Sequence, residues 1–316
     1  MTAPILVIYN PHAGRGRVRA LWPQVELALR QAGVDFDIAA TGFPLDALRL
    51  GAQAAQEYSA VVSVGGDGTT HEVVNGLLRA SAEGETIPLG IVPMGTGDDF
   101  VKMLPPETPI GGKPFDWSAA VERIARGQTH LYDVGRIQAE GKKPGLGDGP
   151  HYFTNSMTLG FGALAAFHHA SMPRFLKGIW AYFAAIARTM VAFPVLHARF
   201  TLDEQPAFEQ ASTITAVMNG RCFGNGMWVA PQACADDGSL DMMITREISR
   251  LTIIRLLPKL MQGKHIHEPE VAMYRARKVV IESVAPLVVE ADGEVPFLQA
   301  RRLEVTVLPG RLRVMV

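Results

Sequence analysis

The sequence has little cysteine, no excess of one charge and no uninterrupted apolar run of membrane-spanning length. Its 316 residues include only two cysteines, Cys222 and Cys234, so no disulfide framework is implied and a reducing cytoplasm is expected. The formal net charge of −1 gives no general attraction to nucleic acid. The longest apolar stretch, residues 178–196, is interrupted by Arg188 and Pro194. It predicts a helix that is buried or lies at an interface, not a membrane span.

Secretory, repeat and zinc-binding patterns are also missing. The first residues lead directly into a strand-like run, without the basic and apolar regions of a signal peptide. No internal repeat is visible, and the histidines at 168, 169, 265 and 267 lack cysteine or carboxylate partners at zinc spacing. A hydrophobic content of 48% and a charged content of 19% describe a globular protein, long enough for two domains.

The first part of the chain alternates strand-like and helix-like segments, which predicts a mostly parallel, doubly wound α/β sheet. The predicted strands are residues 5–9, 35–39, 60–64 and 89–92, and the predicted helices are residues 17–32, 45–58 and 117–127.

Glycine-rich polar loops follow three of these strands, at residues 10–16, 65–68 and 93–100. The carboxyl ends of parallel strands meet at one edge of a sheet, where ligands bind. Glycine allows close approach of a phosphate to the backbone, and the helix after Gly68 offers unpaired N–H groups to that anion. Thr69 and Glu72 fit a capping box at the start of this helix. Asp67 is placed to orient Mg²⁺ or a nucleophile, although each loop alone could be an ordinary turn.

From about residue 131 onwards, short strand-like runs follow one another and predict an antiparallel β-sandwich. Residues 140–150 read as a mobile hairpin loop. The runs are residues 131–139, 152–159, 196–202, 212–218, 239–245, 279–282, 287–290 and 303–308.

Two helices are expected as insertions in this β domain. Residues 249–261 start at a Ser249 cap and stop at Gly263, and they are interpreted as plain packing through an apolar stripe of Leu251, Ile254, Leu257 and Met261.

Residues 174–193 carry an apolar stripe and, on another face, three basic side chains, Arg174, Lys177 and Arg188. This pattern fits a helix lying on an anionic membrane and equally fits a core helix with one solvated face.

Acidic side chains gather at two turns of the second part. Asp236, Asp237 and Asp241 offer oxygen ligands suited to Mg²⁺ or Ca²⁺, or form an Asp-rich turn without a metal. Asp292–Gly293 predicts a hairpin turn that presents Glu294 at a strand end.

Five separated motifs together resemble the diacylglycerol/sphingosine-type lipid kinase family, whose nucleotide domain is related to that of NAD kinases. The motifs are Asn10–Gly14; Gly65–Glu72 with Asn75–Gly76; Pro93–Gly97 with Asp99–Phe100; Asn219–Gly224 through Ala230–Pro231 to Asp236–Asp241; and Asp292–Glu294.

The resemblance implies an α/β nucleotide-binding domain at residues 1–129 and a β-sandwich lipid-binding domain with inserted helices at residues 130–302. The last strands, about residues 303–316, are expected to return to the first domain. The implied activity is an ATP-dependent transfer of phosphate to the hydroxyl of diacylglycerol or a related lipid alcohol, a transferase step in phospholipid metabolism.

The resemblance also implies roles for individual residues. Glu294 would be the general base, with Asp67 as a second catalytic residue. Mg²⁺ would be bound by Asp237 and by the main-chain carbonyls of Cys234 and Ser239. ATP would be held by Asn10, Pro11, His12, Ala13, Gly14, Thr41, Gly65, Gly66, Asp67, Gly68, Thr69, Thr70, His71 and Thr96.

The expected partners are ATP and a lipid at the surface of the inner membrane, with a homodimer possible and no nucleic acid. Two departures from the family pattern keep alternatives open: Asp98 replaces an asparagine, and Gly162 replaces an acidic residue. The alternatives are an NAD kinase-like or other small-molecule kinase and a lipid-binding module whose kinase site has decayed.

Overall fold

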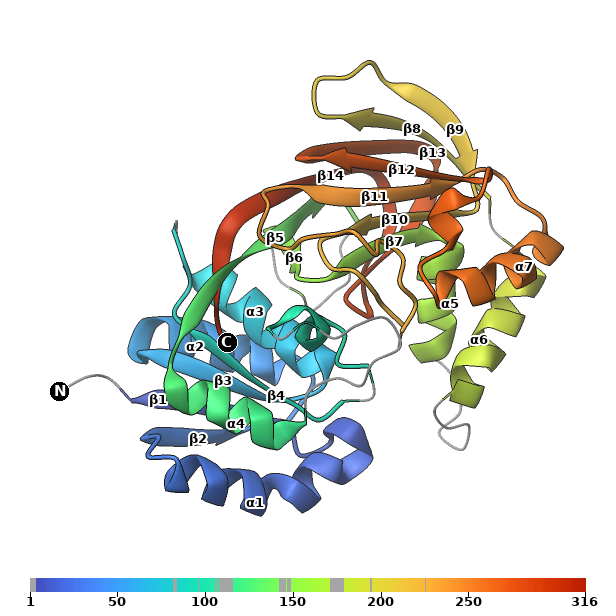
Figure 1. Cartoon of the computed structure of the whole chain (residues 1–316). Helices are drawn as coiled ribbons and strands as arrows, with labels where there is room; N and C mark the ends of the chain where they lie inside the picture. Colours follow the sequence, from blue (N-terminus) through green and yellow to red (C-terminus); the bar gives the residue numbers. More distant parts are fainter. Residues whose placement is uncertain are drawn as a thin grey trace. The chain divides into compact units, whose positions relative to one another are not determined.

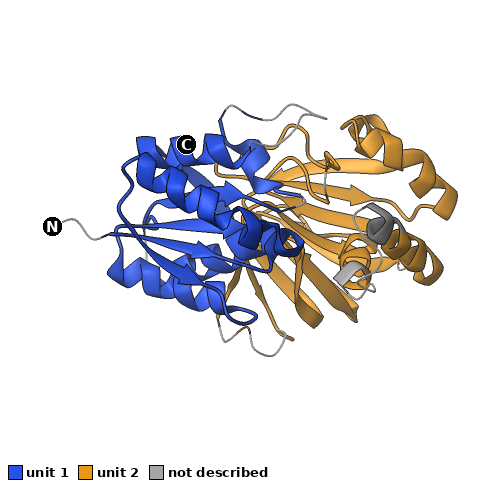
Figure 2. Cartoon of the chain, turned by 90° about the horizontal axis from the view of Figure 1, so that it is seen from below, with its two compact units in different colours: residues 1–134, 308–316 blue, residues 135–307 orange. Residues whose placement is uncertain are grey.

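The structure is a computed structural model of the chain. It describes residues 4–316 except 82–83, 96, 106, 108–115, 142–145, 147–148, 171–178, 194 and 225. The chain forms two compact units, residues 1–134 with 308–316 and residues 135–307, and it passes from one unit to the other twice (Figure 2).

The first unit is built on parallel strands in the order β2-β1-β3-β4, followed by the last residues of β14. The pairing β1–β2, β1–β3 and β3–β4 is parallel throughout, and Val314 of β14 pairs with Leu89 in the same sense. Its strands are β1 (Ile5–Tyr9), β2 (Phe36–Ala40), β3 (Ala60–Gly65) and β4 (Leu89–Pro93), and its helices are α1 (Arg17–Gln31), α2 (Asp46–Glu57), α3 (Asp67–Ala80) and α4 (Trp117–Arg126).

Helices cover both faces of this sheet, α1 and α4 on one and α2 and α3 on the other (Figure 1). Every residue of β3 and β4 is buried, as expected for central strands covered on both faces. The predicted doubly wound α/β domain is therefore confirmed.

The second unit is an antiparallel β structure with three helices that pack together through a shared apolar cluster (Figure 1). Its strands are β6 (His151–Phe153), β7 (Ser156–Gly160), β8 (Leu196–Leu202), β9 (Phe208–Ser212), β10 (Ile214–Met218), β11 (Leu240–Thr245), β12 (Val271–Ala276) and β13 (Lys278–Ala291), with parts of β5 (Thr129–Ala139) and β14 (Glu294–Met315). Its helices are α5 (Phe161–Ala170), α6 (Ile179–Ala192) and α7 (Arg250–Leu260).

The strand order β12-β11-β10-β7-β13-β14 is antiparallel at each step, and β8 pairs with β13 and β9. One apolar cluster fills the space between the strands, with Phe153, Phe200 and Phe297 among its largest members. The β-sandwich with inserted helices is thus confirmed. Among the described residues, no helix combines the length and the apolar character needed to cross a membrane.

Several segments differ from their predictions. The run 152–159 is broken by a turn into β6 and β7, and the runs 279–282 and 287–290 are one strand, β13, with shifts of register. Strands β9 and β12 and helix α5 were not predicted. Most of the 140–150 loop, and both Arg174 and Lys177, lie outside the described residues.

The predicted capping box is wrong. Helix α3 starts at Asp67, its N-cap is Gly66, and no side chain caps it. Thr69 therefore lies inside the first turn, where its hydroxyl accepts a hydrogen bond from the side-chain amide of Asn10. Glu72 instead accepts a hydrogen bond from the backbone N–H of Leu45 at the start of α2.

The predicted packing face of α7 is only partly correct, since Leu257 packs against an apolar cluster but Leu251 and Ile254 do not. The predicted cap is correct: the Ser249 hydroxyl accepts from the backbone N–H of Thr252. The buried residues of α7 are Ile253 and Leu256, whereas Leu251 and Ile254 are 78% and 61% exposed. The helix carries two apolar faces, and the sequence periodicity alone selected the outer one.

Candidate functional site

Three loops at the carboxyl ends of β1, β3 and β4 meet within the first unit. The Asn10 side-chain amide donates to the Thr69 hydroxyl at 3.1 Å, which joins the first loop to the start of α3. The backbone N–H of Asn10 donates to the Val64 carbonyl, and that of Met94 donates to the Gly65 carbonyl. The predicted meeting of the glycine loops at one sheet edge is confirmed.

Glycines allow these loops to lie backbone against backbone. A Cβ atom on Gly14, whose φ is +56°, would lie 2.5 Å from the Met94 carbonyl oxygen. A Cβ atom on Gly66 would lie 2.9 Å from the Cα atom of Gly95. Both contacts are closer than a side chain permits, so these glycines are required by the geometry of the loops.

Asp67 connects the second loop to the third. Its carboxylate accepts hydrogen bonds from the backbone N–H groups of Asp98 and Asp99, at 2.7 and 2.8 Å. Asp98, with φ at +48°, turns its own carboxylate back to accept from the Gly95 N–H at 3.0 Å. Lys102 forms a short ion pair with Asp99 in the same buried cluster. Asp67 is thus the acceptor that fixes the conformation of the loop after β4.

Burial dominates the electrostatics of this cluster. Desolvation, together with the nearby Asp99 and Asp98 charges, raises the pKa of Asp67 to about 7, against the opposing effect of its two backbone hydrogen bonds. Desolvation also raises the pKa of Asp98 to about 6. Both carboxyl groups therefore change their charge near neutral pH.

The other predicted nucleotide residues of the first unit have different surroundings. Thr41 is buried beside the end of β1, where its N–H donates to the Tyr9 carbonyl. Thr70 and His71 are buried within α3, and the Thr70 hydroxyl bonds to Ser63 of β3. Thr96 lies outside the described residues. The N–H of His12 donates to the Asn10 side chain, which shapes the turn before Gly14.

In the second unit, Asp292 and Gly293 form the predicted two-residue hairpin turn between β13 and β14. Both have positive φ, +49° and +89°, and the flanking residues Ala291 and Glu294 are paired. This is the geometry of a type I′ turn, which matches the twist of the strands. Glu294 begins β14 with an exposed side chain, and the described residues give its carboxylate no hydrogen bond or ion pair.

Asp292 holds this turn against the loop between β6 and β7. Its carboxylate accepts from the backbone N–H groups of Thr154, Asn155 and Ser156, at 2.8, 3.0 and 2.9 Å, and from the Thr154 hydroxyl. Buried Glu290 adds two contacts of 2.6 Å, accepting from the Thr158 hydroxyl and from the Gly293 N–H. Glu294 is therefore presented by a rigid turn.

Asparagines tie the fourth sequence motif to the same loop. The Asn219 side chain donates to the Thr154 carbonyl, and the Asn155 side chain donates to the Cys222 carbonyl, both at 2.7 Å. Sequence reasoning assigned no role to Thr154, Asn155 or Glu290. Thr154 and Asn155 are polar residues inside one strand-like run, and Glu290 ends another, and neither pattern indicates a hydrogen-bond partner.

The acidic turn at Asp237 is already neutralised by the protein. One Asp237 oxygen accepts from the Ser239 N–H at 3.0 Å, and the other is ion-paired with Arg275 of β12. The described residues hold no cluster of three His, Cys, Asp or Glu side chains arranged to bind a metal. The side chain as it lies does not fit the predicted Mg²⁺ site, and metal binding by Cys234, Asp237 and Ser239 stays a prediction.

The two cysteines are both free thiols. Cys222 is buried, and the hydrogen bond from the Cys234 thiol to Asp236 raises the pKa of Cys234 to about 11, so its thiol remains protonated. Neither side chain is placed as a reactive thiolate: Cys222 is buried, and the Cys234 thiol stays protonated.

Family models match both halves of the chain. Residues 4–137 match the diacylglycerol kinase catalytic domain, and residues 155–316 match the YegS C-terminal NAD kinase beta sandwich-like domain. A diacylglycerol kinase of Mycobacterium tuberculosis is 30% identical over 98% of this chain and 94% of its own length. A diacylglycerol kinase of Bacillus subtilis is 27% identical over 91% of this chain and 88% of its own length.

Solved structures share the fold. A diacylglycerol kinase structure from Bacillus anthracis superposes with a TM-score of 0.70 at 20% identity, covering 99% of this chain and 96% of that one. An NAD kinase from Archaeoglobus fulgidus in complex with ATP superposes with a TM-score of 0.52 at 11% identity, covering 99% and 93%. With both halves matched by family models and a relative aligned along nearly its whole length, this chain belongs to the diacylglycerol kinase family of lipid kinases.

Proposed function

We propose that the protein is an ATP-dependent lipid kinase that phosphorylates the hydroxyl of diacylglycerol or a related lipid alcohol. The observation that carries the proposal is the Asp67 carboxylate, which lies half-buried between glycine loops and accepts hydrogen bonds from two backbone N–H groups. Beside these loops, the N-terminus of α3 offers main-chain N–H groups as donors. Such an arrangement suits a polyphosphate.

In the proposed reaction, the glycine loops and the first turn of α3 bind the phosphates of ATP. Glu294 accepts the proton of the lipid hydroxyl as that oxygen bonds to the γ-phosphorus and the bond to the β-phosphate oxygen breaks, releasing ADP. An exposed carboxylate on a rigid turn is suited to this role, because a general base must reach the proton that it removes. ATP enters with Mg²⁺ as part of the substrate.

A lipid substrate requires contact with a membrane surface, and residues 174–193 remain a proposed part of that contact. Arg188 is exposed on α6, while Arg174 and Lys177 lie outside the described residues. Location at the inner face of the cytoplasmic membrane follows from the same proposal.

Labelled ATP incubated with extracted membrane lipids tests the activity directly. The expected result is one labelled lipid, identified as the phosphate ester of diacylglycerol or of a related alcohol. Label transferred to NAD or to another small metabolite would support the NAD kinase-like alternative. Calorimetric titration with ATP and Mg²⁺ addresses the decayed-site alternative, because a decayed site would give no binding.

The Glu294→Gln variant tests whether Glu294 is the general base or a residue that only organises the site. The amide keeps the shape of the side chain but cannot accept the proton, so phosphate transfer should fall by roughly 10²–10⁴-fold. ATP affinity should barely change, because the proposed phosphate contacts come from the loops after β1, β3 and β4. If ATP affinity falls as much as transfer, Glu294 organises the site and another group is the base, with Asp67 the first candidate.

A further inference from the structure

The outward face of α7 is apolar although it is exposed to solvent. Leu251, Ile254 and Met261 are 78%, 61% and 44% exposed, and Pro258 is exposed between them. At helical spacing these four side chains fall on one side of the helix. We call them the α7 ridge.

The opposite face of α7 is apolar as well, and it is the face that packs. Ile253 and Leu256 are buried in a cluster with Phe161 and Ala165 of α5, and Met190 of α6 packs against the same cluster. An apolar helix face is normally covered. Because the inner face already supplies the packing, the ridge is not needed to hold α7 in place.

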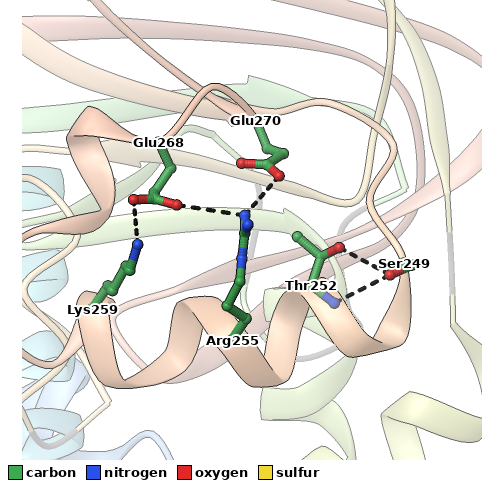
Figure 3. Close-up of polar contacts among 6 residues, drawn as sticks. All are labelled: Ser249, Thr252, Arg255, Lys259, Glu268 and Glu270. Carbon is green, nitrogen blue, oxygen red and sulfur yellow. Dashed lines mark hydrogen bonds and ion pairs between the residues drawn. The ribbon is translucent and has the colours of Figure 1, made fainter.

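Polar contacts on both flanks prevent α7 from rolling to bury the ridge. On one flank, Arg255 bridges Glu268 and Glu270, with the closer contact at 2.6 Å, and Lys259 pairs with Glu268 (Figure 3). On the other flank, Arg250 donates to the Met190 and Val191 carbonyls at 2.8 and 3.2 Å. Its guanidinium also lies 5.3 Å from the centre of the Phe193 ring.

One cation beside the ridge keeps its charge. Of the three cations of α7, Arg255 and Lys259 are ion-paired with Glu268 and Glu270, whereas Arg250 contacts backbone carbonyls and the Phe193 ring and no carboxylate of the described residues. Val191, which is 80% exposed, lies at the end of α6 that Arg250 contacts, so it adds to the apolar surface there.

The size of the ridge argues against a protein partner. Eleven residues at about 1.5 Å each make a helix only about 16 Å long and about 10 Å wide, so its outer face covers on the order of 200 Å². A stable protein interface buries about 800 Å² on each side. A convex apolar ridge beside the Arg250 cation fits an anionic bilayer, which needs no complementary groove.

We propose that the α7 ridge inserts into the headgroup region of an anionic bilayer and docks the protein there. This inference rests on the proposed lipid kinase function, which requires the enzyme to work at a membrane. It assigns the docking to an element separate from residues 174–193.

The test uses the full chain and vesicles of phosphatidylcholine containing about one third phosphatidylglycerol. The double variant Leu251→Ser, Ile254→Ser should lower the fraction cosedimenting with vesicles by about tenfold or more, because two inserted side chains are lost. Val284→Ser is the matched control: Val284 is 90% exposed but lies on β13, so its removal should leave binding unchanged. Melting temperatures without vesicles should match the wild type, since all three side chains are exposed.

Wild-type vesicle binding by the double variant overturns the proposal. If the wild type is a dimer in light scattering and that variant is a monomer with vesicle binding intact, the ridge is a contact between copies. Phosphorylation of detergent-dispersed diacylglycerol is measured in parallel and should be unaffected by the double variant. If the wild type binds vesicles through α7 but phosphorylates no lipid, the docking stands and the proposed function fails.

Discussion

At the scale of single residues, the acidic cluster of the first unit differs from most aspartates, which lie charged and exposed at a protein surface. Asp67 has two hydrogen bonds that favour its charged form, yet desolvation and the neighbouring acids outweigh them and raise its pKa to about 7. A desolvated carboxylate beside two other acids costs stability, and here it fixes the loop after β4. Stability and site geometry are therefore in conflict at this residue.

That conflict predicts a pH dependence of stability. Between the unfolded pKa of about 3.9 and the folded pKa of about 7, only the folded state holds the Asp67 proton, so the free energy of unfolding falls as pH rises across this range. Asp98, with its pKa raised to about 6, adds to the fall in the lower part of the range. Urea unfolding between about pH 5 and about pH 8 measures the slope. Asp67→Asn should flatten it; an unchanged slope would assign the dependence to other groups.

Asp292 is expected to be the most sensitive residue of the hairpin that presents Glu294. Asp292→Asn keeps the positive φ but replaces one acceptor oxygen by a donor that faces backbone N–H groups. The free energy of unfolding should fall by about 2–4 kcal/mol, and kcat should fall with little change in KM for ATP. Asp35→Asn, at an exposed turn, removes the same charge and should do neither.

At the scale of elements, α2 and α3 are in contact through their backbones. A Cβ atom on Gly51 of α2 would lie 2.6 Å from the Val73 carbonyl oxygen, and one on Gly76 of α3 would overlap the Leu48 carbonyl oxygen. These glycines therefore set how closely the two helices approach. Gly76 is part of one of the motifs on which the family resemblance rests, and this contact gives it a packing role.

Gly76→Ala should destabilise the protein although alanine is the better helix former. The gain in helix propensity is about 1 kcal/mol, whereas forcing the two backbones apart costs about 1–3 kcal/mol and more when neither can yield. Thermal unfolding should show a net loss of stability, and Gln56→Ala on the exposed side of α2 should show none. A stabilised Gly76→Ala variant would mean that the helices can separate freely.

The positions of most strands could be predicted from the sequence where their residues form a continuous apolar run. Strands β1, β3 and β4 were placed within a residue because their apolar runs are continuous. Strand β2 was also placed within a residue, although only Phe36 is buried in it. Strands β9 and β12 were missed because most of their residues are only partly buried, so no alternation marks them. The packing face of α7 was assigned incorrectly in part, because the helix has a second apolar stripe. The Asp67 contacts could not be predicted, since their donors lie about thirty residues away and are main-chain groups.

At the scale of the whole molecule, the first unit is completed by residues 308–316. Leu312 and Val314 are fully buried there, the Gly310 N–H donates to Asp133, and the Arg313 N–H donates to the Thr86 hydroxyl. These contacts are made by the strand beside β4.

Removal of residues 308–316 should therefore unfold the first unit, which would lose a strand and its buried side chains. Circular dichroism and limited proteolysis should show a lost or strongly lowered transition. Removing Val316 alone costs one backbone hydrogen bond, to the Gln128 carbonyl, and should change the melting temperature only slightly. A truncated protein with a wild-type transition would show that this strand is dispensable.

The return of the chain to its first unit also constrains how the protein is made. On the ribosome, β1 to β4 emerge early, but the strand that pairs with β4 is synthesised after every residue of the second unit. The edge of β4 stays open throughout that interval, and open strand edges are sites of aggregation. A ribosome stalled late in translation would thus release a chain with its second unit fully synthesised and its nucleotide-binding unit unfinished, a natural target for quality-control proteases.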